Sequence, residues 1–168
     1  KRMSYTGVSK VLAGEPEALK EDEDFVPMIQ KMQELSTILR ERRGKRGSID
    51  FDFPETKIEL DEKGKPINIK PYERNSATKI IEDFMLLANE TVAEEYFWRE
   101  VPFLYRTHEV PDEEKIKKLS TFINNFGYHI HVHDEVKPKE IQKLLSQVEG
   151  TPEEALISRL TLRSMCQA

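Results

Sequence analysis

Apolar side chains recur at helical spacing through most of this chain. From Phe25 to about Arg43, and again from about Asn75 to Trp98, they fall at i, i+3, i+4 and i+7 and form one stripe along a helix. These two stretches therefore predict long amphipathic helices. Shorter stretches with the same spacing predict helices over Thr6–Leu12, Asp112–Phe126 and Lys139–Val148, and a last helix that runs towards Met165.

Glycine and proline mark where these helices should begin and end. Gly44, Gly127 and Gly150 each follow a periodic stretch, a position at which glycine commonly ends a helix. Thr151-Pro-Glu-Glu154 has the pattern of a capping box with proline in the first turn, so it predicts the start of the last helix. Pro102–Pro111 lies between two predicted helices and is expected to be a loop.

Three short stretches have the pattern of β-strands. Ser48–Phe53 alternates strictly between apolar and polar residues. Lys57–Asp61 and Pro66–Lys70 flank Glu62-Lys-Gly-Lys65, which is a hairpin signal with glycine at the tight position. The predicted fold class is therefore α+β, rich in helix, with a small antiparallel sheet.

The composition is that of one domain with a modest core. Of the 168 residues, 38% are hydrophobic and 34% are charged. No apolar run approaches the roughly 20 residues that a membrane helix needs, and no signal-peptide pattern opens the chain. The single Cys166 excludes an internal disulfide and suits a reducing compartment. We therefore expect a cytoplasmic protein that acts away from membranes. We also expect it to be a monomer.

The net charge argues against nucleic-acid binding, whereas one cationic segment allows it. A net charge of −5 is unusual for a protein that relies on phosphate contacts, although the acids cluster in Glu15–Asp24 and Glu109–Glu114. The segment Arg40-Glu-Arg-Arg-Gly-Lys-Arg46 instead has five cations and one anion. This run is either a solvated helix end, where cations suit the helix dipole, or a phosphate contact through residues such as Arg43 and Arg46.

The second long helix carries polar groups among its apolar ones. Arg74, Glu82 and Asn89 lie in or beside the apolar stripe, where a solvated helix would not need them. The pattern Arg74-x-x-Ala…Ile-Glu-Asp-Phe-Met-Leu-x-Ala-Asn89 resembles the catalytic domain of the ribonuclease II family of 3′ exoribonucleases.

Four further segments resemble the same family, in the family's order along the chain. They are the opening Met3–Gly14, the Arg-Gly-Ser-Ile-Asp-Phe stretch Arg46–Phe51, the loop Pro102–Pro111 and the Leu-Arg-Ser-Met segment Leu162–Ala168. Together the matches cover nearly the whole chain and are most similar to the ribonuclease R-like branch. Cys166 stands where that branch commonly has a lysine, so any contact between that lysine and RNA is lost here.

The resemblance implies a magnesium-dependent enzyme that degrades single-stranded RNA hydrolytically and processively from the 3′ end to nucleoside monophosphates. The aspartate cluster that holds the family's catalytic magnesium does not occur in this sequence, and neither does the Ser-Pro-Ile-Arg motif. Residues 1–168 are therefore expected to form an internal segment of a single ribonuclease II-type catalytic domain, with the magnesium ligands upstream. The segment is then expected to have no catalytic residue of its own and to be inactive alone.

A second function remains open at this point. The acidic balance and the absent aspartate cluster favour a non-catalytic RNA-binding or scaffold module. The residues that flank this chain in its gene would separate the two functions, because an enzyme needs both missing motifs.

Phe51 is the first candidate site residue. In an alternating strand a phenylalanine is most often part of the core. The resemblance instead places an aromatic ring here against a base near the RNA 3′ end. Stacking on any base suits an enzyme that must pass through every sequence.

Glu82 and Asp83 are the next candidates. Either carboxylate could be a solvated helix edge. In the resembled family the glutamate of this motif faces the terminal nucleotides, where it can accept a hydrogen bond from a ribose 2′-hydroxyl. Glu82 is the first choice for this role, and Asp83 is the second.

Arg74, Asn89, Arg106 and His108 form a looser group, of which Arg74, Arg106 and His108 are taken as candidate RNA-binding residues. Arg106 and His108 lie in the proline-bounded loop, where polar side chains can reach a ligand. The alternative is that they tie loop backbone together. The resemblance points to contact with the RNA channel or to support of the catalytic centre.

Several possible metal sites are rejected. Asp50 with Asp52, and Asp22 with Asp24, could bind magnesium in principle, but alternating acids are the ordinary solvent side of a strand. The three histidines of His129-x-His-x-His133 would share one face if Tyr128–His133 formed a strand. No other ligand motif accompanies them, so no metal site is predicted within this chain.

Overall fold

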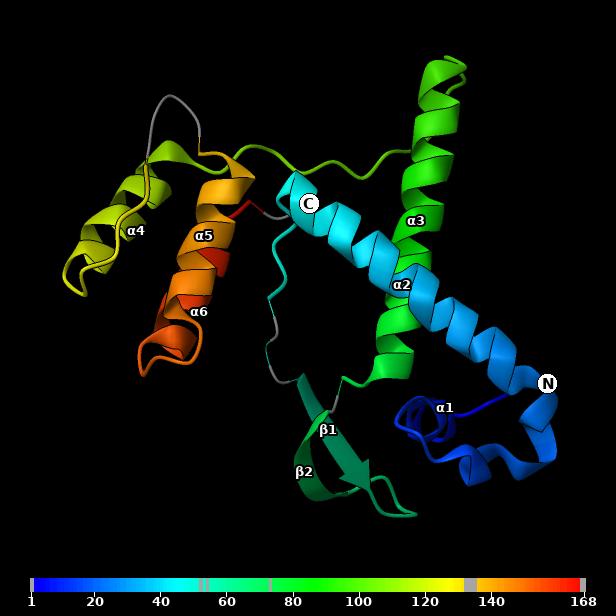
Figure 1. The fold of residues 1–168 in the computed structure, drawn as a ribbon. Helices are drawn as coiled ribbons and strands as arrows, with labels where there is room; N and C mark the ends of the chain where they lie inside the picture. The colour runs from blue at the N-terminus through cyan, green and yellow to red at the C-terminus, as the bar shows by residue number, and fades with distance from the viewer. Residues whose placement is uncertain (1, 52, 54, 73, 132–135, 167–168) are drawn as a thin grey trace. The chain divides into compact units, whose positions relative to one another are not determined.

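The computed structural model describes residues 2–51, 53, 55–72, 74–131 and 136–166. The chain divides into two units that are described one at a time. Unit 1 comprises Lys1–Glu41 and Asp52–Val101, and unit 2 comprises Arg42–Phe51 and Pro102–Ala168. The structure is rich in helix and has a two-stranded antiparallel sheet (Figure 1), which confirms the predicted fold class.

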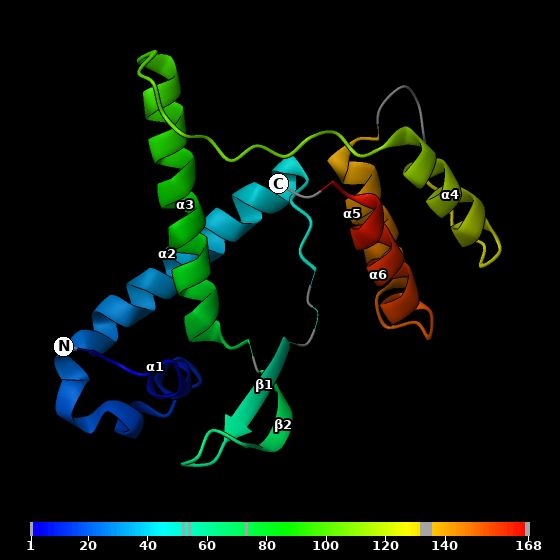
Figure 2. The same ribbon diagram turned by 180° about the vertical axis from the view of Figure 1, so that it is seen from behind.

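Unit 1 is built on helices whose starts are fixed by polar caps. Its helical elements are α1 (Tyr5–Leu12), the 3-10 helix η1 (Pro16–Phe25), most of α2 (Val26–Arg46) and α3 (Ser76–Trp98) (Figure 2). Ser4 caps α1 by accepting a 3.1 Å hydrogen bond from the amide of Gly7. The side chain of Asn75 caps α3 in the same way through the amide of Thr78, at 3.0 Å. Among these elements only η1 was not predicted, because its acidic sequence has no apolar period.

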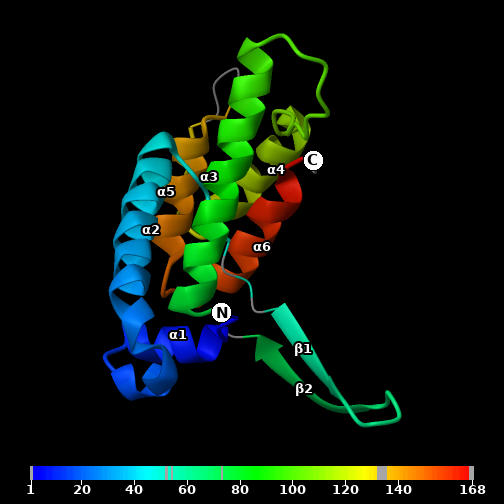
Figure 3. The same ribbon diagram turned by 90° about the vertical axis from the view of Figure 1, so that its right-hand side faces the viewer.

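The hairpin of unit 1 follows the predicted pattern. Strands β1 (Glu55–Leu60) and β2 (Pro66–Tyr72) pair antiparallel with Ile58 opposite Ile69 (Figure 3). Asp61 closes the turn by accepting hydrogen bonds of 2.8 Å from the amides of Lys63 and Lys65. Gly64 has a φ of 79°, a conformation that glycine adopts without strain.

Unit 2 encloses an aliphatic core between three helices. These are α4 (Glu113–Asn124), α5 (Pro138–Val148) and α6 (Glu154–Ser164). Their apolar stripes meet in a cluster with Ile130, which lies between α4 and α5; the helical members are Ile116, Leu119, Ile123, Leu144, Val148 and Ile157. The pattern predicted all three helices because each buries a stripe of the expected period.

The predicted strand at Ser48–Phe53 is wrong, because residues 48–51 and 53 form no strand. Alternation alone cannot supply the partner strand that a ladder requires, and the carbonyl of Ser48 accepts a hydrogen bond from the side chain of Gln142 instead. Residues 128–131 of the ambiguous stretch Tyr128–His133 also form no strand, while residues 132 and 133 lie outside the described residues.

Two predicted helix boundaries are also wrong. Helix α2 continues through Gly44 and ends at Arg46, because Gly47, with φ of 99°, adopts the left-handed conformation that ends it. Helix α6 begins at Glu154 and not at the predicted capping box. The hydroxyl of Thr151 donates to the carbonyl of Val148 at 2.6 Å, so it closes the preceding helix and does not cap the next.

Candidate nucleic-acid interface

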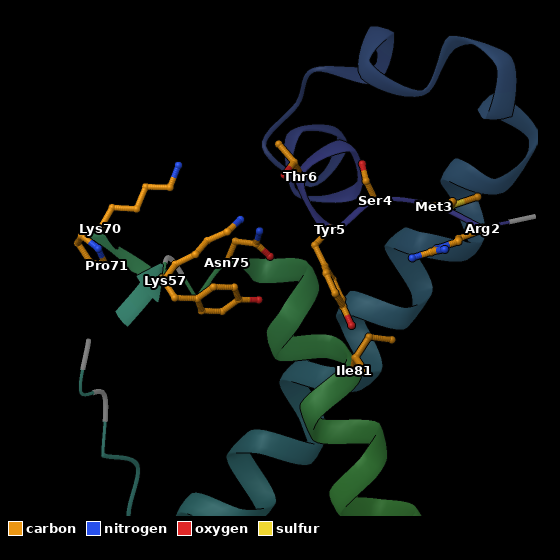
Figure 4. Close-up of a pocket in the computed structure, with 11 residues that line it drawn as sticks. Arg2, Met3, Ser4, Tyr5, Thr6, Lys57, Lys70, Pro71, Asn75 and Ile81 are labelled. Atoms are coloured by element: carbon orange, nitrogen blue, oxygen red, sulfur yellow. The ribbon is translucent and has the colours of Figure 1, made fainter. Parts of the chain in front are cut away.

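A cavity of about 1040 Å³ lies in unit 1 beside the hairpin, the start of α3 and the start of α1 (Figure 4). Arg2, Lys57 and Lys70 contribute cationic side chains to its lining. Tyr5 and Tyr72 contribute aromatic rings, and Figure 4 shows the Tyr5 side chain extending towards Ile81 of α3. Cations together with aromatic rings are the groups that hold a single nucleic-acid strand. None of these five residues was a predicted site residue, because they are scattered over three segments.

The hairpin places two of these cations side by side. Lys57 and Lys70 are direct cross-strand partners, an arrangement that repels unless an anion lies nearby. Glu59 forms an ion pair with Lys70, and its carboxylate also accepts a 3.0 Å hydrogen bond from Asn68. The hydrogen bonds from Lys70 and Asn68 hold the pKa of Glu59 below its ordinary value of 4.5. The hairpin therefore compensates Lys70 within its own surface.

Asp83 lies in the interior of unit 1, where its side chain joins α3 to α2. The residue is 1% exposed. Its Oδ2 atom accepts hydrogen bonds from the Ser36 hydroxyl at 2.6 Å and from Arg40 Nη2 at 2.9 Å. Ser36 is itself 3% exposed, whereas the Arg40 side chain is 32% exposed. Arg40 is thus committed to an internal ion pair, a role that the charge pattern did not reveal.

Glu82 occupies a different environment from its neighbour Asp83. Successive residues differ by about 100° around a helix, so the two carboxylates point in different directions. Arg74 donates to both oxygens of Glu82, at 2.7 Å to each from Nη2 and at 3.0 Å from Nε to Oε2. The Glu82 side chain is 41% exposed and the Arg74 side chain 19% exposed. The structure therefore brings these two predicted site residues together and leaves the carboxylate accessible.

The remaining predicted site residues belong to unit 2. Arg43 is half-buried and Arg46 is exposed, and both lie in the last turns of α2. Phe51 is half-buried and lies in the irregular segment that follows. Arg106 and His108 are exposed within the loop 102–111, which has no regular structure, as the sequence predicted.

Two histidines of the sequence His129-x-His-x-His133 have local partners. His129 Nδ1 lies 2.7 Å from the Asn124 side-chain oxygen, and His131 Nδ1 lies 3.4 Å from Glu140. His133 and Asp52 lie outside the described residues. In the part of the chain that the structure describes, no group of three or more histidine, cysteine, aspartate or glutamate side chains is arranged to hold a metal ion. Within the same residues, no helix has both the length and the apolar character to cross a bilayer.

Comparison with known proteins gives a consistent match over the whole chain. The model of the RNB domain matches residues 1–168. Ribonuclease R from Aquifex aeolicus is 42% identical over 99% of this chain, and ribonuclease R from Thermotoga maritima is 42% identical over all of it. In both cases the match covers 24% of the relative, so this chain spans about a quarter of the length of these proteins.

Several solved structures have a closely similar fold. Mycoplasma genitalium RNase R in complex with ribose-methylated single-stranded RNA has a TM-score of 0.91 and 30% identity, over 99% of this chain and 26% of that one. The same protein in complex with double-stranded RNA has a TM-score of 0.89 over 97% of this chain and 29% of that one.

Proposed function

This chain belongs to the RNB domain family, and from that premise we propose that it is part of an exoribonuclease that hydrolyses single-stranded RNA from the 3′ end to nucleoside monophosphates. The observation that carries the proposal is the likeness, over 99% of the chain, to a ribonuclease whose structure contains single-stranded RNA. The cations and rings of the unit 1 cavity are consistent with it. Residues 1–168 would then form an internal segment of a single catalytic domain, in a protein that acts in the cytoplasm as a monomer.

Within this proposal the chain's task is to position RNA. Phe51 stacks on a base near the 3′ end, while Arg43, Arg46, Arg106 and His108 contact the phosphate backbone. These five residues all lie at least partly exposed at the surface of unit 2.

Glu82 is assigned to the ribose 2′-hydroxyl. A carboxylate has about four acceptor positions, so the fork of Arg74 leaves room for another donor. Arg74 thereby orients the carboxylate of Glu82 for a hydrogen bond from the ribose hydroxyl. Asp83 is given a different role: because it is 1% exposed and bonded to Ser36 and Arg40, it offers no surface to an RNA and braces α3 against α2.

Magnesium, if the family's chemistry holds here, would supply an activated water for attack on the last phosphodiester. The acids and histidines of the described residues form no group that fits such an ion. The family's aspartate cluster does not occur in the sequence either, so we propose that the magnesium ligands lie outside residues 1–168 and that this chain contributes RNA-facing residues.

The experiment that tests the function uses the full-length protein and one RNA labelled in turn at each end. We expect the 3′ label to appear at once as a mononucleotide, whereas the 5′ label stays on a strand that ends as a short oligonucleotide. Chelation of divalent metal should stop both processes. Internal cleavage, or tight binding without any mononucleotide, would contradict the proposal, and the second outcome would establish the binding-module alternative.

The isolated 168-residue chain gives a matched control for the same assay. We predict that it releases no mononucleotide in magnesium, because the family's aspartate cluster does not occur in its sequence and its described residues form no group that could hold the metal. Magnesium-dependent release by the purified chain would place the catalytic centre within residues 1–168.

A further inference from the structure

One side chain of α5 is bonded to both sides of the end of α2. The Gln142 side-chain amide donates to the carbonyl of Gly44 and to the carbonyl of Ser48, each at 3.0 Å. Gly44 lies in the last turn of α2, and Ser48 is the second residue beyond the helix. A single amide group therefore spans the point at which the chain changes from helix to irregular segment.

Glycine makes this close approach possible. Gly47 has a φ of 99°, and its amide donates to the carbonyl of Gly44 at 3.0 Å, while the amide of Ser48 donates to that of Arg43 at 3.0 Å. This is the pairing of a Schellman motif. A Cβ atom added at Gly47 would lie 3.1 Å from Lys139 Cγ and 3.2 Å from the Lys139 backbone nitrogen. The first turn of α5 thus packs directly on the left-handed residue.

The bonded segment carries three of the residues assigned to RNA. Arg43 and Arg46 lie immediately before Gly47, and Phe51 follows Ser48 by three residues. The segment Arg42–Phe51 also groups with unit 2 and not with the rest of α2. Because residues 48–51 have no strand partner, the contacts at Gly44, Gly47 and Ser48 set the direction in which the chain leaves the helix.

We propose that Gln142 is a positioning residue for RNA binding: it orients the segment that carries Arg43, Arg46 and Phe51 without touching the RNA. The proposal rests on the function proposed above. Two hydrogen bonds to backbone carbonyls suit a positioning role, because they fix main chain and leave the cationic and aromatic side chains unoccupied by Gln142 itself.

The test compares variants of the full-length protein. Gln142→Met keeps the length of the side chain but removes both donors, and Gln142→Glu places a carboxylate against two carbonyls. Gln147→Met is the matched control, since Gln147 is an exposed glutamine on the same helix. Ile116→Val, a core change in unit 2, controls for a loss of stability that does not act through the segment.

Two readouts are measured on each protein. Hydrogen exchange at the amides of Gly47 and Ser48 should speed up about tenfold in Gln142→Met, the effect of losing about 1.4 kcal/mol of hydrogen bonding. Binding of a single-stranded RNA should weaken about fivefold or more, the loss of about one stacked base. The length of the final product should also shift, and we expect the same direction of shift in Phe51→Ala, which removes the stacking ring itself. Gln142→Glu should exceed Gln142→Met in both effects, while Gln147→Met and Ile116→Val should match the wild type in RNA affinity.

The outcomes separate this inference from the proposed function. If the wild-type protein neither binds nor shortens RNA, the proposed function fails and the inference falls with it. If the wild type is active and Gln142→Met matches it in RNA affinity and product length, only the positioning role is overturned. Equal losses in Gln142→Met and Ile116→Val would also overturn it, because they would show an effect of stability alone.

Discussion

Each of the two units has an interior of a different kind. In unit 2, seven aliphatic side chains close a core in which Ile123, Val148 and Ile157 have no exposed surface. Unit 1 also buries apolar side chains, namely Val11, Ile29, Leu39, Ala77 and Ile80, but it adds a buried charge between α2 and α3, with Asp83 bonded to Ser36 and Arg40. Aliphatic packing tolerates modest changes of shape, whereas a buried ion pair depends on every partner.

This difference reflects two neighbouring carboxylates on α3. The helix presents adjacent carboxylates, of which Asp83 is used inside and Glu82 remains at the surface with Arg74. The contacts of Asp83 with Ser36 and Arg40 act together with the buried Ala77 and Ile80 to orient α3, which turns Glu82 to the surface.

The largest effect is expected where that buried charge is removed. Asp83→Ala should lower the stability of unit 1 by about 3–5 kcal/mol, because Arg40 and Ser36 lose their acceptor in the interior. Glu82→Ala should cost no more than about 1 kcal/mol, since the pair with Arg74 is partly solvated. Hydrogen exchange along α3 in the full-length protein measures both. Equal losses of stability in the two variants would contradict the role of Asp83 in joining α3 to α2.

The two glycines near the end of α2 should respond in opposite directions. Gly47→Ala should destabilise the protein by about 1–2 kcal/mol, because an L-residue is strained at a φ of 99° and its Cβ would crowd Lys139. Gly44→Ala should stabilise it by about 0.8–1 kcal/mol, since Gly44 is helical and no atom lies within 4 Å of the added Cβ. Thermal unfolding of the two variants gives the signs, and a stabilising Gly47→Ala would contradict the left-handed end of α2.

The smallest effect concerns the stability of the hairpin at low pH. The pKa of Glu59 is lowered by its hydrogen bonds with Lys70 and Asn68, so its contribution to folding is complete above the ordinary value of 4.5. That contribution is lost as the pH falls below 4.5 and through the lowered pKa. Glu59→Gln should remove this pH dependence, which amide exchange in β1 and β2 between pH 6 and pH 3 would detect. Identical profiles for the two proteins would contradict the pairing of Glu59 with Lys70.

The sequence predicted the α-helices of both units because each has an apolar stripe of helical period, and it predicted the hairpin from the turn at Gly64. It failed where the deciding partner is distant in sequence. Ser48–Phe53 alternates like a strand, yet the partner of Ser48 is the side chain of Gln142. The same limit applies to the candidate site: composition could not show that Asp83 faces Ser36 and Arg40, or that Tyr5 shares a cavity with Lys57.

The central claim is that α3 helps to position RNA, with Glu82 facing the ribose and the buried Asp83 holding the helix in place. The most direct test is the rate of mononucleotide release from RNA and from a matched strand with 2′-deoxy sugars near the 3′ end. A hydrogen bond to a charged acceptor contributes about 1.5–3 kcal/mol, so the wild-type full-length protein should prefer RNA by about ten- to a hundredfold. Glu82→Ala should reduce that preference severalfold or more, whereas Asp83→Asn should lower both rates in proportion. An unchanged preference in Glu82→Ala, or a preference lost in Asp83→Asn alone, would contradict this division of roles.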